Sequence, residues 1–512
     1  MNKRRRIFAA PSLFGGAGVS CFLCFLWFFG TSQAFAIDLE KRVNKTVMNN
    51  GITLLVMERT VSPTVSIYIQ HRAGAVDEDS GYSGAAHLLE HMMFKGTRTI
   101  GTSDYDEESR LRQRIEERVR RLEITVRTEG SGSEAARALE EEIRRLEDEK
   151  RSYIRSNEID RLYRERGGVG LNAATGHDMT SYMVSLPSNS LELWARIESD
   201  RLSNPVFREF VQERNVVIEE RRQVVDSRPE RQLMELFLAA AFIAHPYGHP
   251  VIGWPADIPR IDRDYLLHFF ATRYRPENTV ITIVGDVRTE EAAGLVRRYF
   301  GSLGNGVPPG STLRNITDEP PQRGERRTTL RSGASPRLLL GFHKPAFPAY
   351  EDAVFDVLEL VLAGGRSSRL YRSLVTERGI AASVRVSNGF PGERYDNLFI
   401  IAAEPMTGRS LAELEDALYS ELDRLKDEPL PERELRKAKN RIKTDFLRGF
   451  DSNNGIARLL SYVETLTGDY REVTTYLEAV ESITAEDIMN AASSRLTSSN
   501  RTVAVLIQDE TP

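Results

Sequence analysis

Apolar residues in the first third of the chain recur with the periods of strands and helices. Residues 64–70 are apolar at every second position and residues 51–57 form a short apolar run, so both segments are expected to be strands. A glycine-rich turn at residues 74–84 then leads into a predicted helix that contains residues 87–91 and packs against the sheet. A helix backed by a sheet gives rigid support to the side chains it carries.

Residues 105–160 differ in composition from the rest of the chain. Leu111 and Leu139 belong to two apolar series that repeat every three or four residues, and nearly every position between the apolar ones is Glu or Arg. The break at residues 128–134 separates the two series, which predicts an antiparallel helical hairpin that projects from the body. This hairpin is either a solvated spacer without specific contacts or an arm for docking or gating.

The second half of the chain repeats the order of elements expected in the first. Residues 304–321 are rich in Gly and Pro and are expected to form a linker. Beyond the linker we expect a strand, three helices and a final strand, at residues 337–342, 352–362, 411–427, 431–448 and 502–507. The second half is therefore interpreted as a diverged copy of the first.

The N-terminus has the three parts of a secretory signal peptide. Basic residues 3–6 precede an apolar stretch at residues 17–30, and residues 34–36, Ala-Phe-Ala, offer a small-x-small cleavage site. We expect cleavage after Ala36 and a periplasmic or secreted protein. The alternative is an uncleaved anchor, because residues 11–30 are nearly long enough to span a bilayer, and only then is membrane contact expected.

Composition and charge narrow the range of functions. The chain has 512 residues, enough for two large domains or three small ones, and a formal charge of −5. Loss of residues 1–36, which hold four basic and no acidic residues, makes the charge −9, and an acidic surface argues against nucleic acid or anionic lipid as a partner. Both cysteines, Cys21 and Cys24, lie in the signal region. The mature chain is expected to have no disulfide, thiolate ligand or cysteine nucleophile, as suits an oxidising compartment.

The strongest chemical signal is the pattern His87-x-x-Glu90-His91 on the first predicted helix. At helical spacing His87 and His91 stand one turn apart, and Glu90 projects from the same side. Two imidazoles and a carboxylate are what a zinc hydrolase needs, because the imidazoles hold the ion and the carboxylate takes a proton from water. The order of the residues is that of the inverzincin motif. The alternative is a chance pattern on an amphipathic helix.

A third metal ligand is expected on the helical segment at residues 209–225. Glu213 and Glu220 are seven residues apart, which is two turns, and share a face, whereas Glu219 is rotated by about 100° from Glu220. The alternative is a charged helix face that contacts only solvent.

Two further segments are expected near this site. Residues 167–175 form a glycine run that enters a strand, an edge to which an extended peptide can add, with Asn172 and Ala173 as candidate substrate-binding residues. His245 and His249 lie in a predicted loop, and we expect them to be structural or close to substrate rather than metal ligands.

Together these motifs resemble those of the pitrilysin, insulinase and mitochondrial processing peptidase family of inverted-motif zinc peptidases. The resemblance covers nearly all of the chain after residue 36 except the hairpin. Its motifs stand in the family's order: His87-x-x-Glu90-His91, Asn172-Ala-Ala-Thr175, Glu213-Arg-Asn-Val-Val-Ile-Glu-Glu220, His245-Pro-Tyr and Val284-Gly-Asp286.

The resemblance assigns roles to the candidate residues. It implies one zinc ion per chain, held by His87, His91 and Glu220, with Glu213 as a nearby supporting acid and Glu90 as the general base. The interval between His91 and Glu220 is longer than is usual in the family by about the length of the hairpin. An insertion explains this interval without disturbing the site.

The resemblance also implies the fold, which is α+β with two similar domains, each a mostly antiparallel sheet covered by helices. Residues 37–303 form the expected zinc-binding peptidase domain, with the hairpin of residues 105–160 inserted into it. Residues 304–326 form the expected linker, and residues 327–512 a homologous domain without zinc. This is the short two-domain type found in bacteria, whose members generally work as dimers.

One departure from the family's pattern concerns catalysis. Where members competent in substrate binding carry an arginine and a tyrosine seven residues apart, which hold the substrate carbonyl, this chain has Val375 and Ala382. We therefore expect a hetero-oligomer in which a paralogous subunit without the zinc motif supplies that pair, so that peptides or unfolded polypeptides are cleaved. The competing interpretations are a non-catalytic structural or peptide-binding subunit of the same fold, and a coiled-coil adaptor with an accidental motif.

Overall fold

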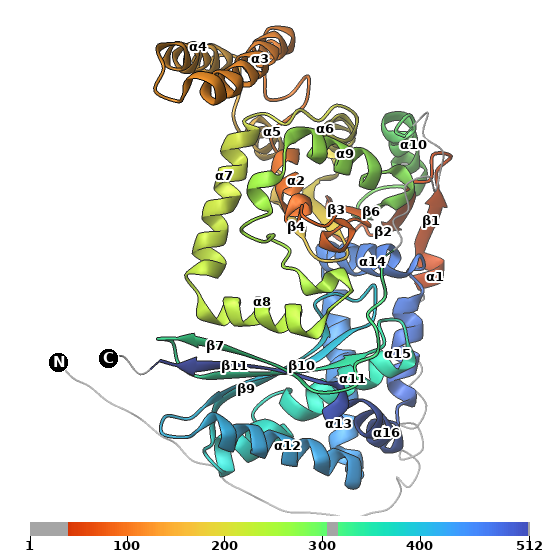
Figure 1. Ribbon diagram of the computed structural model, residues 1–512. Coiled ribbons are helices and arrows are strands. Elements are labelled where there is room, and N and C mark those ends of the chain that lie inside the picture. The colour runs from red at the N-terminus through yellow and green to blue at the C-terminus, as the bar shows by residue number, and fades with distance from the viewer. Residues whose placement is uncertain (1–38, 305–315, 510–512) are drawn as a thin grey trace, which may run out of the picture. The chain divides into compact units, whose positions relative to one another are not determined.

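Two β-sheets flanked by helices organise the part of the chain that the computed structural model describes, residues 39–304 and 316–509 (Figure 1). The first sheet has the order β1-β2-β6-β3-β5-β4 and is antiparallel except where β2 lies parallel to β6. The predicted signal peptide, residues 1–36, lies outside the described residues. The strands of the first sheet are β1 (Val43–Val47), β2 (Thr53–Glu58), β3 (Thr64–His71), β4 (Val169–Thr175), β5 (Thr180–Pro187) and β6 (Thr279–Gly285).

The second sheet has the order β7-β11-β8-β10-β9 and is antiparallel except where β7 lies parallel to β11. Both sheets are thus mostly antiparallel, and the predicted α+β class with two similar halves is confirmed. Residues 305–315 of the predicted linker lie outside the described residues. The strands of this sheet are β7 (Arg326–Ser332), β8 (Arg337–Lys344), β9 (Ala381–Phe390), β10 (Asn397–Pro405) and β11 (Arg501–Gln508).

Helices cover both sheets and connect their strands. None of the helices in the described ranges is both long and apolar enough to cross a membrane. The helices are α1 (Leu39–Arg42), α2 (Ala85–Met93), α3 (Tyr105–Glu129), α4 (Glu134–Arg151), α5 (Glu158–Glu165), α6 (Leu191–Ser203), α7 (Phe210–Arg221), α8 (Pro229–Ala241), α9 (Arg263–Arg273), α10 (Thr289–Phe300), α11 (Tyr350–Ala363), α12 (Leu411–Asp427), α13 (Glu432–Gly449), α14 (Asn453–Thr467), α15 (Glu472–Ser482) and α16 (Ala485–Arg495).

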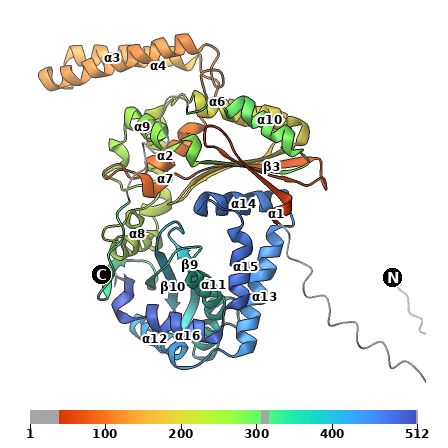
Figure 2. The ribbon, with the colours of Figure 1, turned by 90° about the vertical axis from the view of Figure 1, so that its right-hand side faces the viewer.

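Each sheet is also covered by a helix from the other half of the sequence. α14 packs on β3 and β6 of the first sheet, and α8 packs on β7 and β11 of the second (Figure 1, Figure 2). Phe237 of α8 is buried together with Leu339 and Leu398 of the second sheet. Gly341 in β8 provides the necessary room, because a Cβ atom there would lie 2.4 Å from the Phe237 ring. One buried cluster therefore contains residues of both halves, in addition to the separate core of each half.

The segment at residues 105–160 contains the antiparallel helices α3 and α4, which lie side by side and away from both sheets (Figure 2). Leu111, Ile115 and Leu146 are buried and pack together along the hairpin. The side chain of Asp104 caps the first turn of α3 by accepting backbone hydrogen bonds. This narrow apolar seam supports two helices whose remaining surface is charged.

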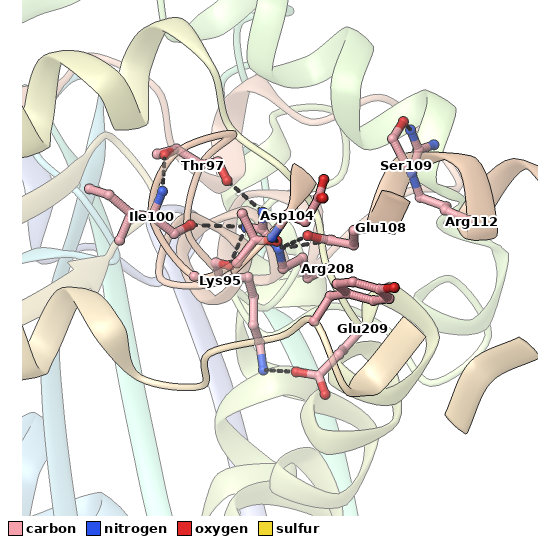
Figure 3. Close-up of polar contacts among 12 residues, drawn as sticks. Lys95, Thr97, Ile100, Asp104, Glu108, Ser109, Arg112, Arg208 and Glu209 are labelled. Atoms are coloured by element: carbon pink, nitrogen blue, oxygen red, sulfur yellow. Dashed lines mark hydrogen bonds and ion pairs between the residues drawn. The ribbon is translucent and has the colours of Figure 1, made fainter. Parts of the chain in front are cut away.

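Arg208, in the connection between α6 and α7, links the base of the hairpin, at the start of α3, to the loop after α2 (Figure 3). Its side chain is 1% exposed, and its guanidinium forms an ion pair with Glu108 of α3 at 2.9 Å. It also donates hydrogen bonds to the carbonyl oxygens of Lys95, Thr97 and Ile100, at 3.0, 2.5 and 3.2 Å. Because these carbonyls lie in the loop after α2, the base of the hairpin, this loop and the start of α7 form one hydrogen-bonded unit.

Replacing Glu108 by alanine should lower the free energy of unfolding by about 3–5 kcal/mol, because the buried guanidinium of Arg208 loses its only carboxylate partner among the described residues. Urea denaturation measures the change. The matched control is Glu107→Ala, which removes a carboxylate paired with Arg110 on the exposed side of the same helix and should cost less than about 1 kcal/mol. Equal effects of the two substitutions would contradict the anchoring role of the Arg208–Glu108 pair.

Candidate metal centre

Two helices from distant parts of the sequence bring three metal-binding side chains together. His87 and His91 lie on α2, and Glu220 lies one residue before the end of α7. The Nε2 atoms of His87 and His91 are 3.8 and 3.6 Å from Glu220 Oε2, and the candidate ligand atoms lie within 4.8 Å of one another. Donor atoms about 2.0–2.1 Å from one ion, at tetrahedral angles, lie about 3.4 Å apart. The three side chains therefore fit a zinc ion after small shifts.

The sequence of α2 explains why its polar side chains face this site. Leu88, Leu89 and Met92 are fully buried in the core of the first sheet. At helical spacing this apolar face leaves His87 and His91 on the other side of the helix. The core contacts thereby set the orientation of both histidines.

Glu78 fixes the start of α2. Its buried carboxylate accepts hydrogen bonds from the N–H groups of Gly84 and Ala86, at 3.0 and 2.7 Å. Burial raises the pKa of Glu78 well above its usual value, against the lowering effect of these hydrogen bonds. The first turn of the helix, which leads into His87, is thus held by a side chain as well as by the core.

A carboxylate supports His91 from behind. His91 Nδ1 is 2.9 Å from Glu213 Oε1, and the ammonium group of Lys95 is 2.5 Å from Glu213 Oε2. A histidine that donates from Nδ1 to a carboxylate keeps its Nε2 lone pair free for a metal. Burial acts to lower the pKa of His91, but the hydrogen bond to Glu213 and the charges of the neighbouring carboxylates together raise it. These carboxylates favour a cation at the site.

His87 is held differently from His91. Burial, together with the nearby His91, lowers the pKa of His87 to about 4, so the ring is neutral near pH 7 and available as a ligand. Its Nδ1 atom is buried and has no hydrogen-bond partner among residues 39–304 and 316–509. Of the two histidines, only His91 therefore has a carboxylate hydrogen-bonded to its Nδ1 atom.

Glu90 lies beside the three candidate ligands and is held by a strand. Its Oε2 atom accepts a hydrogen bond from the hydroxyl of Thr175, the last residue of β4, at 2.5 Å. Burial raises the pKa of Glu90, while hydrogen bonds from the Thr175 hydroxyl and backbone N–H oppose this rise. A carboxylate with a raised pKa is suited to exchange protons near neutral pH.

The same strand carries the candidate substrate-binding residues. β4 lies at the edge of the first sheet and pairs with β5 alone within the described part of the chain. Asn172 and Ala173 lie three and two residues before Thr175, on the strand that contacts Glu90. An open strand edge is where an extended peptide can add as a further strand. The structure therefore places these two residues near the candidate centre, on an edge that suits peptide binding.

A cavity of about 450 Å³ opens beside Glu90 and His91. Its other walls are the loop after α2, the segment at residues 154–159 that returns from the hairpin, and the start of α7. Lys95 and Glu209 form an ion pair in its lining at 3.7 Å (Figure 3). The segments at the base of the hairpin thus line the space next to the candidate metal ligands.

The histidines of the predicted loop at residues 244–253 take no part in this group. His245 Nδ1 accepts a hydrogen bond from the N–H of Tyr247, and the carbonyl oxygen of His249 is 2.9 Å from Nε2 of His177. Within the described residues, no other set of His, Cys, Asp and Glu side chains has the spacing of a metal site. The structure gives both histidines local structural contacts.

The segment at Val375 and Ala382 lies in the second half. Val375 is part of the helical turn Tyr371–Glu377, and Ala382 is part of β9. Neither side chain has a hydrogen-bond donor. These two positions therefore cannot stabilise an oxyanion with their side chains.

Sequence reasoning gave no role to two residues that contact the site, Lys95 and Thr175. Lys95 follows His91 by four residues, and Thr175 ends the Asn172-Ala-Ala-Thr175 motif. Both positions were therefore visible in the motifs. Their contacts depend on how α2, α7 and β4 meet in space.

Two family models match the chain. A model described as Insulinase (Peptidase family M16) matches residues 54–111 and 151–254, and one described as Peptidase M16 inactive domain matches residues 260–442. The first match omits residues 112–150, most of the hairpin, and includes α2 and α7.

Relatives with similar sequences cover nearly the full length of the chain. The zinc protease PqqE of Helicobacter pylori is 25% identical over 470 residues, which is 90% of this chain and 92% of that protein. An uncharacterised zinc protease of Mycobacterium leprae is 26% identical over 474 residues, 91% of each protein.

Solved structures share the fold. The crystal structure of a protease from Helicobacter pylori has a TM-score of 0.76 at 22% identity and covers 91% of this chain and 99% of that chain. The periplasmic protease PqqL from Escherichia coli has a TM-score of 0.66 at 17% identity and covers 92% of this chain but 48% of that chain. The arrangement of two sheets described above therefore occurs in both.

Proposed function

Because the chain belongs to the insulinase family of peptidases, M16, we propose that it is a zinc metallopeptidase that hydrolyses peptides or unfolded polypeptides. The observation that carries the proposal is the meeting of His87, His91 and Glu220, with Glu90 beside them. The relatives named as zinc proteases support the same activity.

The four residues divide the chemistry among them. His87, His91 and Glu220 would hold the zinc ion through two nitrogens and one oxygen. Zinc, when bound, supplies a Lewis acid that polarises the scissile carbonyl and lowers the pKa of a water molecule. Glu90 takes the proton from the attacking water and later delivers it to the leaving amine nitrogen. Water is thereby added across the peptide bond.

A paralogous subunit completes the site in this proposal. The donor-free side chains of Val375 and Ala382 support it, because the tetrahedral oxyanion formed in peptide hydrolysis needs hydrogen-bond donors. The partner would lack the zinc motif and carry the arginine and tyrosine pair. The resulting enzyme would be a hetero-oligomer with one zinc-bearing subunit.

The alternative is a non-catalytic structural or peptide-binding subunit of the same fold. The absence of donors at Val375 and Ala382 favours this alternative as well, since a peptide binder needs no oxyanion site. The presence of all three candidate ligands and the candidate base favours an enzyme, because a structural subunit does not require zinc ligands or a general base. Metal content separates the two functions.

The purified protein should contain about one zinc ion per chain, removable by a chelator. Glu220→Gln should lower the zinc content, because the amide is a weaker ligand than the carboxylate. The matched control, Glu219→Gln, changes the preceding residue, whose carboxylate pairs with Arg222 on the surface, and should leave the zinc content unchanged. Elemental analysis measures all three proteins. A wild-type protein without zinc would support the non-catalytic alternative.

A further inference from the structure

We propose that Thr175 is a positioning residue for catalysis, whose hydroxyl holds the Glu90 carboxylate in its working orientation. The inference rests on the proposed function and extends it to a residue outside the metal ligands and the base. Thr175 is the last residue of β4, and its Oγ1 atom is 2.5 Å from Glu90 Oε2. The hydrogen bond joins the candidate peptide-binding strand directly to the candidate base.

The Thr175 hydroxyl donates its single proton to Glu90 in this hydrogen bond. An ionised carboxylate only accepts hydrogen bonds, so the hydroxyl is the donor. Its other close neighbour, Thr180 Oγ1, is 3.5 Å away and donates its own proton to the carbonyl oxygen of Ala73 at 2.9 Å. A hydrogen bond to a charged acceptor is about twice as strong as one between neutral groups. Thr175 therefore restrains the carboxylate strongly.

The turn after Thr175 keeps its hydroxyl in place. The carbonyl oxygens of Gly176 and His177 accept hydrogen bonds from the N–H groups of Ala75 and Val76, at 3.1 and 2.9 Å. The glutamate side chain, by contrast, has several rotatable bonds and loses much rotamer freedom when it is fixed. A rigid donor at the end of a strand pre-organises a flexible base.

This arrangement matters because Glu90 must meet a proton at two different positions, on the attacking water and on the leaving nitrogen. Small misplacements of a catalytic group cost large factors in rate. A peptide added along β4 would run beside Asn172 and Ala173 toward Thr175, so the strand that aligns the substrate would also align the base.

Replacing Thr175 by valine keeps the shape of the side chain and removes the donor. In the full-length, zinc-loaded protein, assayed in the assembly in which it is active, kcat should fall roughly 10–100-fold with KM and zinc content unchanged. Thr175→Ser restores the hydroxyl and should keep kcat within about threefold of the wild type. Steady-state kinetics on a quenched fluorescent peptide and elemental analysis provide the readouts.

The matched control is Ser185→Ala, which removes a hydroxyl of β5 that lies opposite Val169 in the β4–β5 ladder and contacts Ser66 rather than Thr175 or Glu90. It should leave kcat within about threefold of the wild type. A loss as large as that of Thr175→Val, a failure of Thr175→Ser to restore kcat, or an effect confined to KM or zinc content would overturn the role of Thr175. Wild-type kcat in Thr175→Val beside an inactive Glu90→Gln would refute this role alone, whereas wild-type kcat in Glu90→Gln would refute the proposed function.

Discussion

Replacing Glu90 by glutamine should leave zinc bound and lower kcat by roughly 10²–10⁴-fold, because the amide has the shape of the carboxylate but cannot take a proton from water. Glu90 is not one of the three candidate ligands His87, His91 and Glu220, so zinc binding should not depend on it. The Thr175 hydroxyl can still donate to the amide oxygen, so the side chain keeps its place. Zinc analysis and peptide turnover, measured on the same preparation, test both halves of this expectation.

His87→Ala should fail in a different way, losing zinc and activity together, because one of three candidate ligands is removed. A matched control is His268→Ala, which removes an exposed histidine of α9 and should change neither quantity. A Glu90→Gln protein with wild-type turnover would rule out the mechanism. Loss of zinc from Glu90→Gln would instead show that Glu90 is a ligand.

The hydrophobic pattern located several strands but could not pair them. β3 and β11 were predicted because apolar alternation and apolar runs are local properties of the sequence. The parallel pairing of β2 with β6, and of β7 with β11, joins segments far apart in the chain. Helices α8 and α14 each pack on the sheet of the other half, and this packing depends on complementary side-chain shapes, such as the Phe237 ring against Gly341. A one-dimensional pattern does not contain such contacts.

The candidate site could be predicted in part, because local spacings are visible in the sequence and long-range contacts are not. His87, Glu90 and His91 follow one helical spacing, and Glu213 and Glu220 follow another, so each set was visible in the sequence. The tertiary structure alone brings the two helices together, with the histidine Nε2 atoms 3.6–3.8 Å from Glu220 Oε2. Lys95 and Thr175 also stand at motif positions, but their contacts, like those of Arg208, join segments distant in the sequence and appear only when the strands and helices are assembled.

The candidate catalytic groups are divided unevenly between the two halves, and this division bears on the oligomeric state proposed for the active protein. The first half holds the candidate metal ligands and the candidate base. In the second half, Val375 and Ala382 offer no donor at the positions where the family's arginine and tyrosine would stand. In the proposed mechanism such a chain would activate water but would lack, at these positions, the hydrogen-bond donors that stabilise the oxyanion.

If the proposed hetero-oligomer is the active form, the isolated chain should cleave peptides at least about 10²-fold more slowly than its assembly with the paralogous subunit, because this is the typical cost of losing one oxyanion donor. Purification from the native cell through a tag on this chain is expected to yield this assembly. Turnover per zinc ion then compares the assembly with the isolated chain. Glu90→Gln introduced into this chain within the assembly is the control, because it should abolish turnover and so prove that the zinc-bearing subunit performs the chemistry. An isolated monomer or homodimer that matches the assembly's rate would show that this chain carries its own oxyanion donors at positions other than 375 and 382.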